Sequence, residues 1–183
     1  INTTRNGLSE GIIWDYKNNS TADWLLDHYG IDSNLTPDLV DNFCNQGTTN
    51  LKSSNETGLN VGVPITYRAG DQPNNALALN VFDNGEVAAS GGTSGVIYSI
   101  TNSIESNEPS RINHFAHVNY NNNNKSIGKL LCINGAGIQY RWLRNHSTHE
   151  SYEKMNEVAA NIPVGSEGIS VIPFGNGAER MLD

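Results

Sequence analysis

The residue in this sequence best suited to catalysis is Asp71, which lies in the segment AGDQ at residues 69–72. The stretch at residues 66–69 is typical of a strand, and Pro73 fits the first turn of a following helix, so we expect Asp71 at a strand-to-helix junction. A carboxylate there can accept the proton of an attacking hydroxyl, and the N–H groups of the helix start favour its negative charge. Taken alone, the segment favours a simpler interpretation, in which Asp71 only caps the helix.

A second candidate is the loop GGTSG at residues 91–95, which separates two predicted strands at residues 86–90 and 96–100. Glycines allow the backbone to approach a ligand closely, and backbone N–H groups and hydroxyls can together bind a phosphate. The loop is not a Walker A motif, because the Gly-Lys-Ser/Thr ending is missing. An ordinary tight hairpin has a similar composition, so the loop by itself does not decide between the two interpretations.

A third candidate is GAGIQ at residues 135–139, which follows a predicted strand at residues 129–133 and leads into a predicted helix at residues 138–145. A glycine turn at the start of a helix lets a nucleotide lie against the backbone. Close packing of a helix on a strand also requires small residues, and that alternative stays open.

Other residues that could bind ligands are better explained without one. Histidines at positions 114 and 117, and again at 146 and 149, have a spacing that can bind a metal on a helix. Neither pair lies in a firmly predicted helix and no carboxylate or cysteine completes a ligand set, so no metal-ligating residue is predicted. The tryptophans at positions 14, 24 and 142 are expected in the core.

The elements that must position these residues alternate between strand-like and helix-like patterns. Predicted strands lie at residues 11–16, 66–69, 86–90, 96–100, 115–120, 129–133 and 169–174. Predicted helices lie at about residues 22–29, 35–40, 47–58, 73–79, 138–145 and 152–160. Ser20 or Thr21 is expected to cap the first of these helices. The mixture predicts an α/β fold without internal repeats, and with a domain boundary near residues 83–85.

The composition excludes several classes of protein. The 183 residues carry a formal net charge of -8, which argues against binding to nucleic acid or to an anionic membrane. No apolar run approaches the roughly 20 residues of a membrane helix, and no signal peptide is recognised. Cys44 and Cys132 form no disulfide framework, so we expect a cytoplasmic protein. A start without Met and an end without a tail suggest an internal piece of a longer chain.

Taken together and in this order, the motifs resemble the FGGY family of carbohydrate kinases, with its xylulokinase branch as the closest. The most specific stretch lies at residues 65–99, where RAGDQPNNAL is followed by GEVAASGGTSGV. It is similar to a family pattern in which a G-x-G-D-N segment precedes G-E-x-x-x-S-x-G-T-S-G. The similarity continues through residues 129–144 and 171–180 and begins upstream at residues 9–26, so it covers nearly the whole chain.

The resemblance implies a ribonuclease-H/actin-like ATPase fold with two domains around a deep cleft. Residues 1–85 would be the C-terminal part of the first, sugar-binding domain, and residues 86–183 the N-terminal part of the second, nucleotide-binding domain. It also implies ATP and Mg²⁺ as cofactors and a small sugar as substrate, with neither nucleic acid nor membrane as partner. A homodimer is compatible with it.

Site residues carry over from the family by position. Asp71 matches the base that takes the proton from the sugar hydroxyl, and Gln72 matches a sugar-contacting amide that is often Asn in xylulokinases. The final motif reads GAER at residues 177–180 where the family has Gly-Glu-Arg, and it is given no role beyond structure.

The same comparison assigns residues to the nucleotide. Gly92, Thr93 and Ser94 match the loop on the ATP phosphates, and Gly135 and Gln139 match a glycine and a glutamine near the nucleotide.

The implied reaction is ATP-dependent phosphorylation of a ketopentose, D-xylulose to D-xylulose 5-phosphate. Two alternatives stay open: a kinase for another acceptor such as ribulose, gluconate or glycerol, and a non-catalytic fragment that only keeps the fold. The chain alone is expected to be inactive, because half of each domain would be missing.

Overall fold

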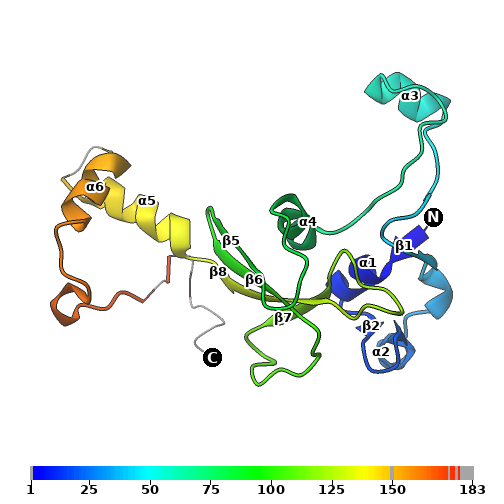
Figure 1. Ribbon diagram of the computed structural model, residues 1–183, viewed down its shortest axis with the longest axis horizontal. Coiled ribbons are helices and arrows are strands. Elements are labelled where there is room, and N and C mark those ends of the chain that lie inside the picture. The colour runs from blue at the N-terminus through cyan, green and yellow to red at the C-terminus, as the bar shows by residue number, and fades with distance from the viewer. Residues whose placement is uncertain (1, 149–150, 173, 176, 178–183) are drawn as a thin grey trace. The chain divides into compact units, whose positions relative to one another are not determined.

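The computed structural model describes residues 2–148, 151–172, 174, 175 and 177 (Figure 1). The chain forms two compact units. Unit 1 consists of Ile1–Ala88, Tyr98–Ser106 and His114–Lys129, and unit 2 consists of Ala89–Ile97, Asn107–Asn113 and Leu130–Asp183. Several limits of these units fall inside strands, and the domain boundary predicted between residues 85 and 86 stays a prediction.

The N-terminal part of unit 1 is built from short elements. They are β1 (Asn2–Thr4), α1 (Arg5–Glu10), β2 (Trp14–Asp15), β3 (Ser20–Thr21), α2 (Asp23–His28), η1 (Ser33–Leu35), β4 (Asp38–Val40), α3 (Leu51–Thr57) and α4 (Asp71–Ala78). The first strand pairs in parallel with β4, and β2 pairs antiparallel with β3.

Local sequence explains where several of these helices begin and end. At the start of α1 the Gly7 N–H donates a hydrogen bond to the Thr4 hydroxyl at 3.1 Å. Asn50 and Ser53 form a reciprocal capping box at the start of α3, and Gly58, with a φ of 77°, ends that helix. Pro73 is buried in the first turn of α4, where its missing N–H costs no helical hydrogen bond.

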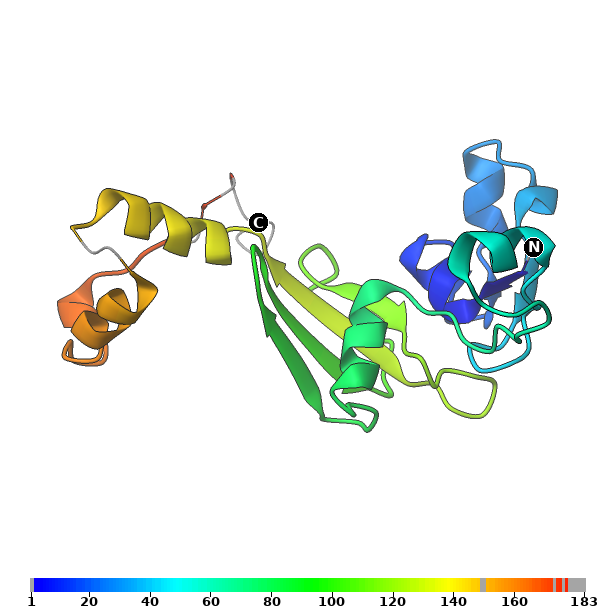
Figure 2. The ribbon, with the colours of Figure 1, turned by 90° about the horizontal axis from the view of Figure 1, so that it is seen from above.

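The later strands form a four-stranded sheet in the order β5-β6-β8-β7. They are β5 (Val87–Gly91), β6 (Gly95–Thr101), β7 (Asn113–Ala116) and β8 (Ile127–Ile133), and β5, β6 and β8 run side by side in Figures 1 and 2. Burial alternates along β6, where Val96, Tyr98 and Ile100 are buried. The chain continues through α5 (Ala136–His146), α6 (Tyr152–Ala159) and η2 (Ser166–Gly168).

The core of unit 1 joins α1 to the sheet. Its cluster contains Leu8 from α1, Trp14 from β2, and Ala116, Tyr120 and Ile127 from β7, the following loop and β8. The Trp14 and Tyr120 rings pack edge to face, with centroids 6.3 Å apart. Because these residues are far apart in the sequence, the cluster fixes α1 against the end of β7, which matters for the candidate site.

Several predicted elements are confirmed. The hairpin predicted at residues 86–100, the strand near 129–133 and the helices near 73–79, 138–145 and 152–160 all form. The helix predicted within residues 47–58 forms as α3, and the strands predicted at 11–16 and 115–120 form as the shorter β2 and the earlier β7. No helix among the described residues is long and apolar enough to cross a membrane.

The prediction of a helix at residues 35–40 is wrong. Only η1 touches its start, and the segment then becomes β4. The reason lies far away in the sequence, because β4 pairs with β1 and places Asn2 opposite Asp38. A local sequence pattern carries no information about a pairing partner that is distant in the sequence.

Three further expectations also need correction. Ser20 and Thr21 form β3 and cap no helix, since α2 starts after Ala22 without a side-chain cap. The strand expected at residues 66–69 is reduced to one isolated bridge between Tyr67 and Phe43. Residues 169–172 form no strand, and residue 173 lies outside the described part.

The tryptophans do not all enter the core as expected. Trp14 is buried, whereas 65% of Trp24 and 57% of Trp142 remain exposed. Apolar type alone therefore predicted burial correctly at one of these positions.

Candidate functional site

Asp71 is the first residue of α4 and is exposed. The helix N-cap is Gly70, which makes no side-chain capping bond, so the interpretation of Asp71 as a capping aspartate is wrong. One Asp71 oxygen, Oδ1, accepts a hydrogen bond from the Gln72 N–H at 2.7 Å. The carboxylate thus lies at the positive end of α4, where it accepts one N–H of the first turn but does not occupy the N-cap position.

A buried asparagine holds the turn that carries Asp71. The Gly70 N–H donates to Asn6 Oδ1 at 2.7 Å, and Asn6 Nδ2 donates to the Ala116 carbonyl at 2.7 Å. Asn6 is fully buried on α1. Its two hydrogen bonds therefore tie the turn before α4 to the end of β7.

Ser9 completes this connection. Its hydroxyl donates to the Asn6 carbonyl at 2.7 Å and accepts from the Ala116 N–H at 2.8 Å. A buried polar network whose members are hydrogen-bonded makes the structure around it more rigid. The residue that follows Gly70 is accordingly held by α1 and β7 together.

A second carboxylate, that of Glu10, lies beside Asp71. A Cβ added to Gly70 would come closer than 3.0 Å to the carboxylate carbon and both carboxylate oxygens of Glu10, so the carboxylate covers the Gly70 backbone. Partial burial raises the pKa of Glu10, and the negative charge of Asp71 raises this pKa further. The motifs did not indicate Glu10, because its proximity to Asp71 arises only from the packing of α1.

The predicted phosphate loop lies in unit 2 against the start of α5. The Gly137 and Ile138 N–H groups donate to the Thr93 carbonyl at 3.0 and 3.3 Å, and the Gly92 N–H donates to the Ser94 carbonyl at 2.9 Å. The Thr93 carbonyl already accepts hydrogen bonds from these two N–H groups of the helix. The hydroxyls of Thr93 and Ser94 are therefore the groups best suited to contact a phosphate.

Close approach of the backbone defines the same place. A Cβ on Gly137 would lie 2.9 Å from the carbonyl carbon of Gly92 and closer still to its oxygen. Only glycine at position 137 allows the loop and α5 to meet in this way. The structure therefore brings Gly92, Thr93 and Ser94 together with the helix that Gly135 precedes.

Gln139 lines a separate cavity in unit 2. The cavity has a volume of about 360 Å³ and is lined by Ile138, Gln139, Trp142, Ile172, Phe174 and Gly175. Gln139 Nε2 donates to the Ile172 carbonyl at 3.2 Å. Mostly apolar walls with a small number of polar groups are typical of small-molecule pockets. Sequence reasoning missed Trp142, Ile172 and Phe174 as lining residues, since each was expected in the core or in a strand.

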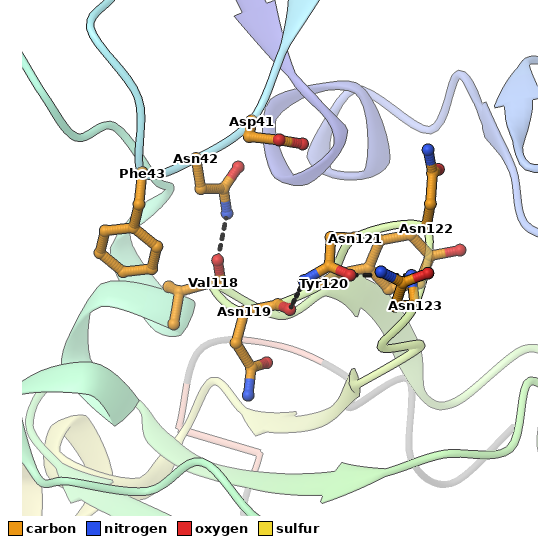
Figure 3. Close-up of a pocket in the computed structure, with 9 residues that line it drawn as sticks. All are labelled: Asp41, Asn42, Phe43, Val118, Asn119, Tyr120, Asn121, Asn122 and Asn123. Carbon is orange, nitrogen blue, oxygen red and sulfur yellow. Dashed lines mark hydrogen bonds between the residues drawn. The ribbon is translucent and has the colours of Figure 1, made fainter.

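A polar cavity of about 370 Å³ lies in unit 1 between residues 41–43 and 118–123 (Figure 3). Asn42 Nδ2 donates to the Val118 carbonyl at 2.9 Å across this cavity, and the Asn121 side chain accepts from the N–H groups of Asn123 and Asn124. The asparagine run at residues 121–124 forms a turn, because the Asn121 N–H donates to the Asn124 carbonyl at 2.8 Å. The Asn121 amide therefore stabilises the loop itself, whereas the Asn42 amide joins the loop to residues 41–43.

The predicted site residues thus fall into two groups. Asp71 and Gln72 lie in unit 1, and Gly92 to Ser94, Gly135 and Gln139 lie in unit 2. Among the described residues, no group of three His, Cys, Asp or Glu side chains could hold a metal. Residues 178–180 of the GAER motif, and His149, lie outside the described residues.

Comparison with known proteins confirms the resemblance to xylulose kinases. The chain is 28% identical over 120 residues to the xylulose kinase of Haemophilus influenzae, which covers 66% of this chain and 23% of that protein. It is 24% identical over 164 residues to the xylulose kinase of Staphylococcus xylosus, with 89% and 33% covered. No family model matches the sequence.

Solved structures decide the fold. A ligand-bound xylulose kinase and a gluconate kinase, both from Lactobacillus acidophilus, superpose over 96% of this chain with TM-scores of 0.84, at 20% and 19% identity. This chain has the sugar-kinase fold. The predicted ribonuclease-H/actin-like ATPase architecture is therefore confirmed.

This fold also occurs in a Plasmodium falciparum glycerol kinase solved with ADP, which covers 87% of the chain with a TM-score of 0.73 and 17% identity. The chain spans about a quarter to a third of the length of the curated relatives that it matches.

Proposed function

We propose that this protein is a sugar kinase that transfers the γ-phosphoryl group of ATP to a ketopentose, with D-xylulose as acceptor and D-xylulose 5-phosphate as product. The observation that carries the proposal is Asp71, whose turn is held by Asn6 through the Gly70 N–H at 2.7 Å. Sequence similarity to xylulose kinases, over 66% and 89% of the chain, supports the choice of acceptor.

In this proposal Asp71 is the catalytic base. The acceptor hydroxyl attacks the γ-phosphorus, the bond from that phosphorus to the bridging oxygen of ADP breaks, and the hydroxyl proton passes to the Asp71 carboxylate. Because the transition state of phosphoryl transfer is loose, positioning matters more than base strength. The fixed Gly70 turn supplies that positioning, and the Gln72 amide contacts another oxygen of the sugar.

The nucleotide would be held by unit 2. Thr93 and Ser94 contact the phosphates with their hydroxyls, and Gly92 allows the close approach. Gly135 and Gln139 lie against the nucleoside. Mg²⁺, held chiefly by phosphate oxygens and water as is usual for this ion, would offset the phosphate charge.

The remaining features of the proposal concern the whole protein. Residues 1–85 belong to a sugar-binding domain and residues 86–183 to a nucleotide-binding domain. Closure of the two domains excludes water and limits wasteful hydrolysis of ATP. A cytoplasmic location and a homodimer stay predictions.

The test is a phosphorylation assay of the full-length protein with ATP and a panel of D-xylulose, ribulose, gluconate and glycerol. We expect the highest kcat/KM with D-xylulose. A clear preference for another acceptor would keep the kinase and reject D-xylulose. No turnover with any acceptor would reject the kinase proposal and favour a non-catalytic role.

A second acceptor class has a specific observation behind it. The gluconate kinase superposes on this chain as well as the xylulose kinase does, with a TM-score of 0.84 in both cases. Fold similarity therefore does not separate a neutral acceptor from a sugar acid, and a local feature of the site has to do so.

A further inference from the structure

Glu10 has no role in the reaction proposed above, yet its carboxylate lies at the candidate base. It is the last residue of α1 and is partly buried. Its carboxylate occupies the space directly over the Gly70 backbone, where a Cβ would collide with it. Since Asp71 directly follows Gly70, any acceptor that contacts the Asp71 carboxylate also lies close to the negative charge of Glu10.

Among the described residues, neither of these two carboxylates has an ion-pair partner. Arg5, at the start of the same helix, pairs with Asp41 at 2.6 Å instead. Two neighbouring carboxylates that lack an ion-pair partner in the described part of the chain create a negative potential at the position where the acceptor must bind.

Such a potential distinguishes acceptors by charge. Carboxylate oxygens accept hydrogen bonds from the hydroxyls of a neutral sugar or polyol. A sugar acid would bring its own carboxylate close to Glu10 and Asp71, and like charges at short range in a partly buried site repel strongly.

We propose that Glu10 is a specificity-determining residue that selects neutral sugars and polyols over sugar acids as the acceptor at Asp71. The proposal rests on the proposed kinase function, because it assigns the acceptor to this place. Gly70 is also required for this selection, since any larger residue there would displace the Glu10 carboxylate.

The experiment measures acceptor binding by isothermal titration calorimetry on the full-length protein, without ATP, for D-xylulose and D-gluconate. For the wild type, we expect the dissociation constant of D-gluconate to be at least about tenfold higher than that of D-xylulose. Glu10→Gln, which keeps the shape and removes the charge, should lower this ratio of dissociation constants by about tenfold. Glu10→Asp should preserve the ratio because it keeps the charge.

Two controls separate this effect from a change in net charge or in folding. Glu56→Gln removes an exposed carboxylate on α3 and should leave the ratio unchanged. In the wild type, added salt should improve gluconate binding relative to D-xylulose, because it screens the repulsion. This second measurement needs no variant, so it tests the proposal even if Glu10→Gln does not fold.

The outcomes separate the two proposals. An unchanged ratio in folded Glu10→Gln, a salt-independent ratio in the wild type, or equal affinity for both acceptors overturns the role of Glu10. If the two sugars bind with the expected ratios but no phosphate is transferred, the kinase proposal fails, and the selection of neutral sugars by Glu10 stands as a property of sugar binding alone. Binding of neither acceptor overturns both.

Discussion

Gly137 offers a sharp test of how the phosphate loop is placed. It lies in the first turn of α5 and donates its N–H to the Thr93 carbonyl at 3.0 Å. In Gly137→Ala, the new Cβ would meet the Gly92 backbone at 2.9 Å or less. Because the obstacle is backbone rather than a flexible side chain, the loop has to move away from α5.

The size of the effect follows from two opposing contributions. Alanine in place of a helical glycine stabilises a helix by up to about 1 kcal/mol. Overpacking against a fixed neighbour costs typically about 1–3 kcal/mol, and the severity of this contact places it at the upper end. The net cost is about 2 kcal/mol, and if the loop has to return to its wild-type position to contact the phosphates, this cost corresponds to a loss of about 30-fold in ATP affinity.

Two neighbouring glycines provide a graded control. A Cβ on Gly95 would lie 3.2 Å from the Ala136 Cβ, and a Cβ on Gly91 would have nothing within 4 Å. ATP affinity of the full-length protein, measured by calorimetry, should therefore be unchanged in Gly91→Ala, slightly reduced in Gly95→Ala and strongly reduced in Gly137→Ala. Wild-type ATP affinity in Gly137→Ala would refute the proposed contact between this loop and the phosphates.

Two further predictions concern stability. Asn6→Ala removes the hydrogen-bond partner of the Gly70 N–H and of the Ala116 carbonyl. Urea unfolding should therefore show a free energy of unfolding that is lower by about 2–3 kcal/mol. A near-zero change would contradict the role of Asn6. Burial lowers the pKa of His117 from 6.5 to about 4, so the unfolded chain takes up the proton first and stability should fall as the pH drops from 6.5 towards 4. His117→Phe should be less sensitive to pH over this window, and a wild-type stability that is flat there would count against the assignment.

Where the sequence predicted structure well, the signal was local. Alternating apolar residues around a glycine-rich loop predicted the hairpin of β5 and β6, and Pro73 marked the first turn of α4. The glycines near residue 135 marked the start of α5 in the same way.

The failures have a common physical cause, because they depend on partners distant in the sequence. β4 is a strand through its pairing with β1, and a local pattern had suggested a helix. Asn6 and Glu10 join the candidate site only because α1 packs beside residue 70, 64 residues further along the chain in the case of Asn6. Nothing in the types of their neighbours in sequence marks them as site residues.

In the proposed reaction, Asp71 is the base for phosphoryl transfer. The most direct measurement compares Asp71→Asn with the wild type, in the full-length protein, for both D-xylulose phosphorylation and ATP affinity. We predict that kcat falls by at least about 100-fold while ATP affinity stays within about twofold, because Asn cannot accept the proton and lies outside the proposed nucleotide site. Phosphorylation at the wild-type rate in Asp71→Asn would contradict the central claim.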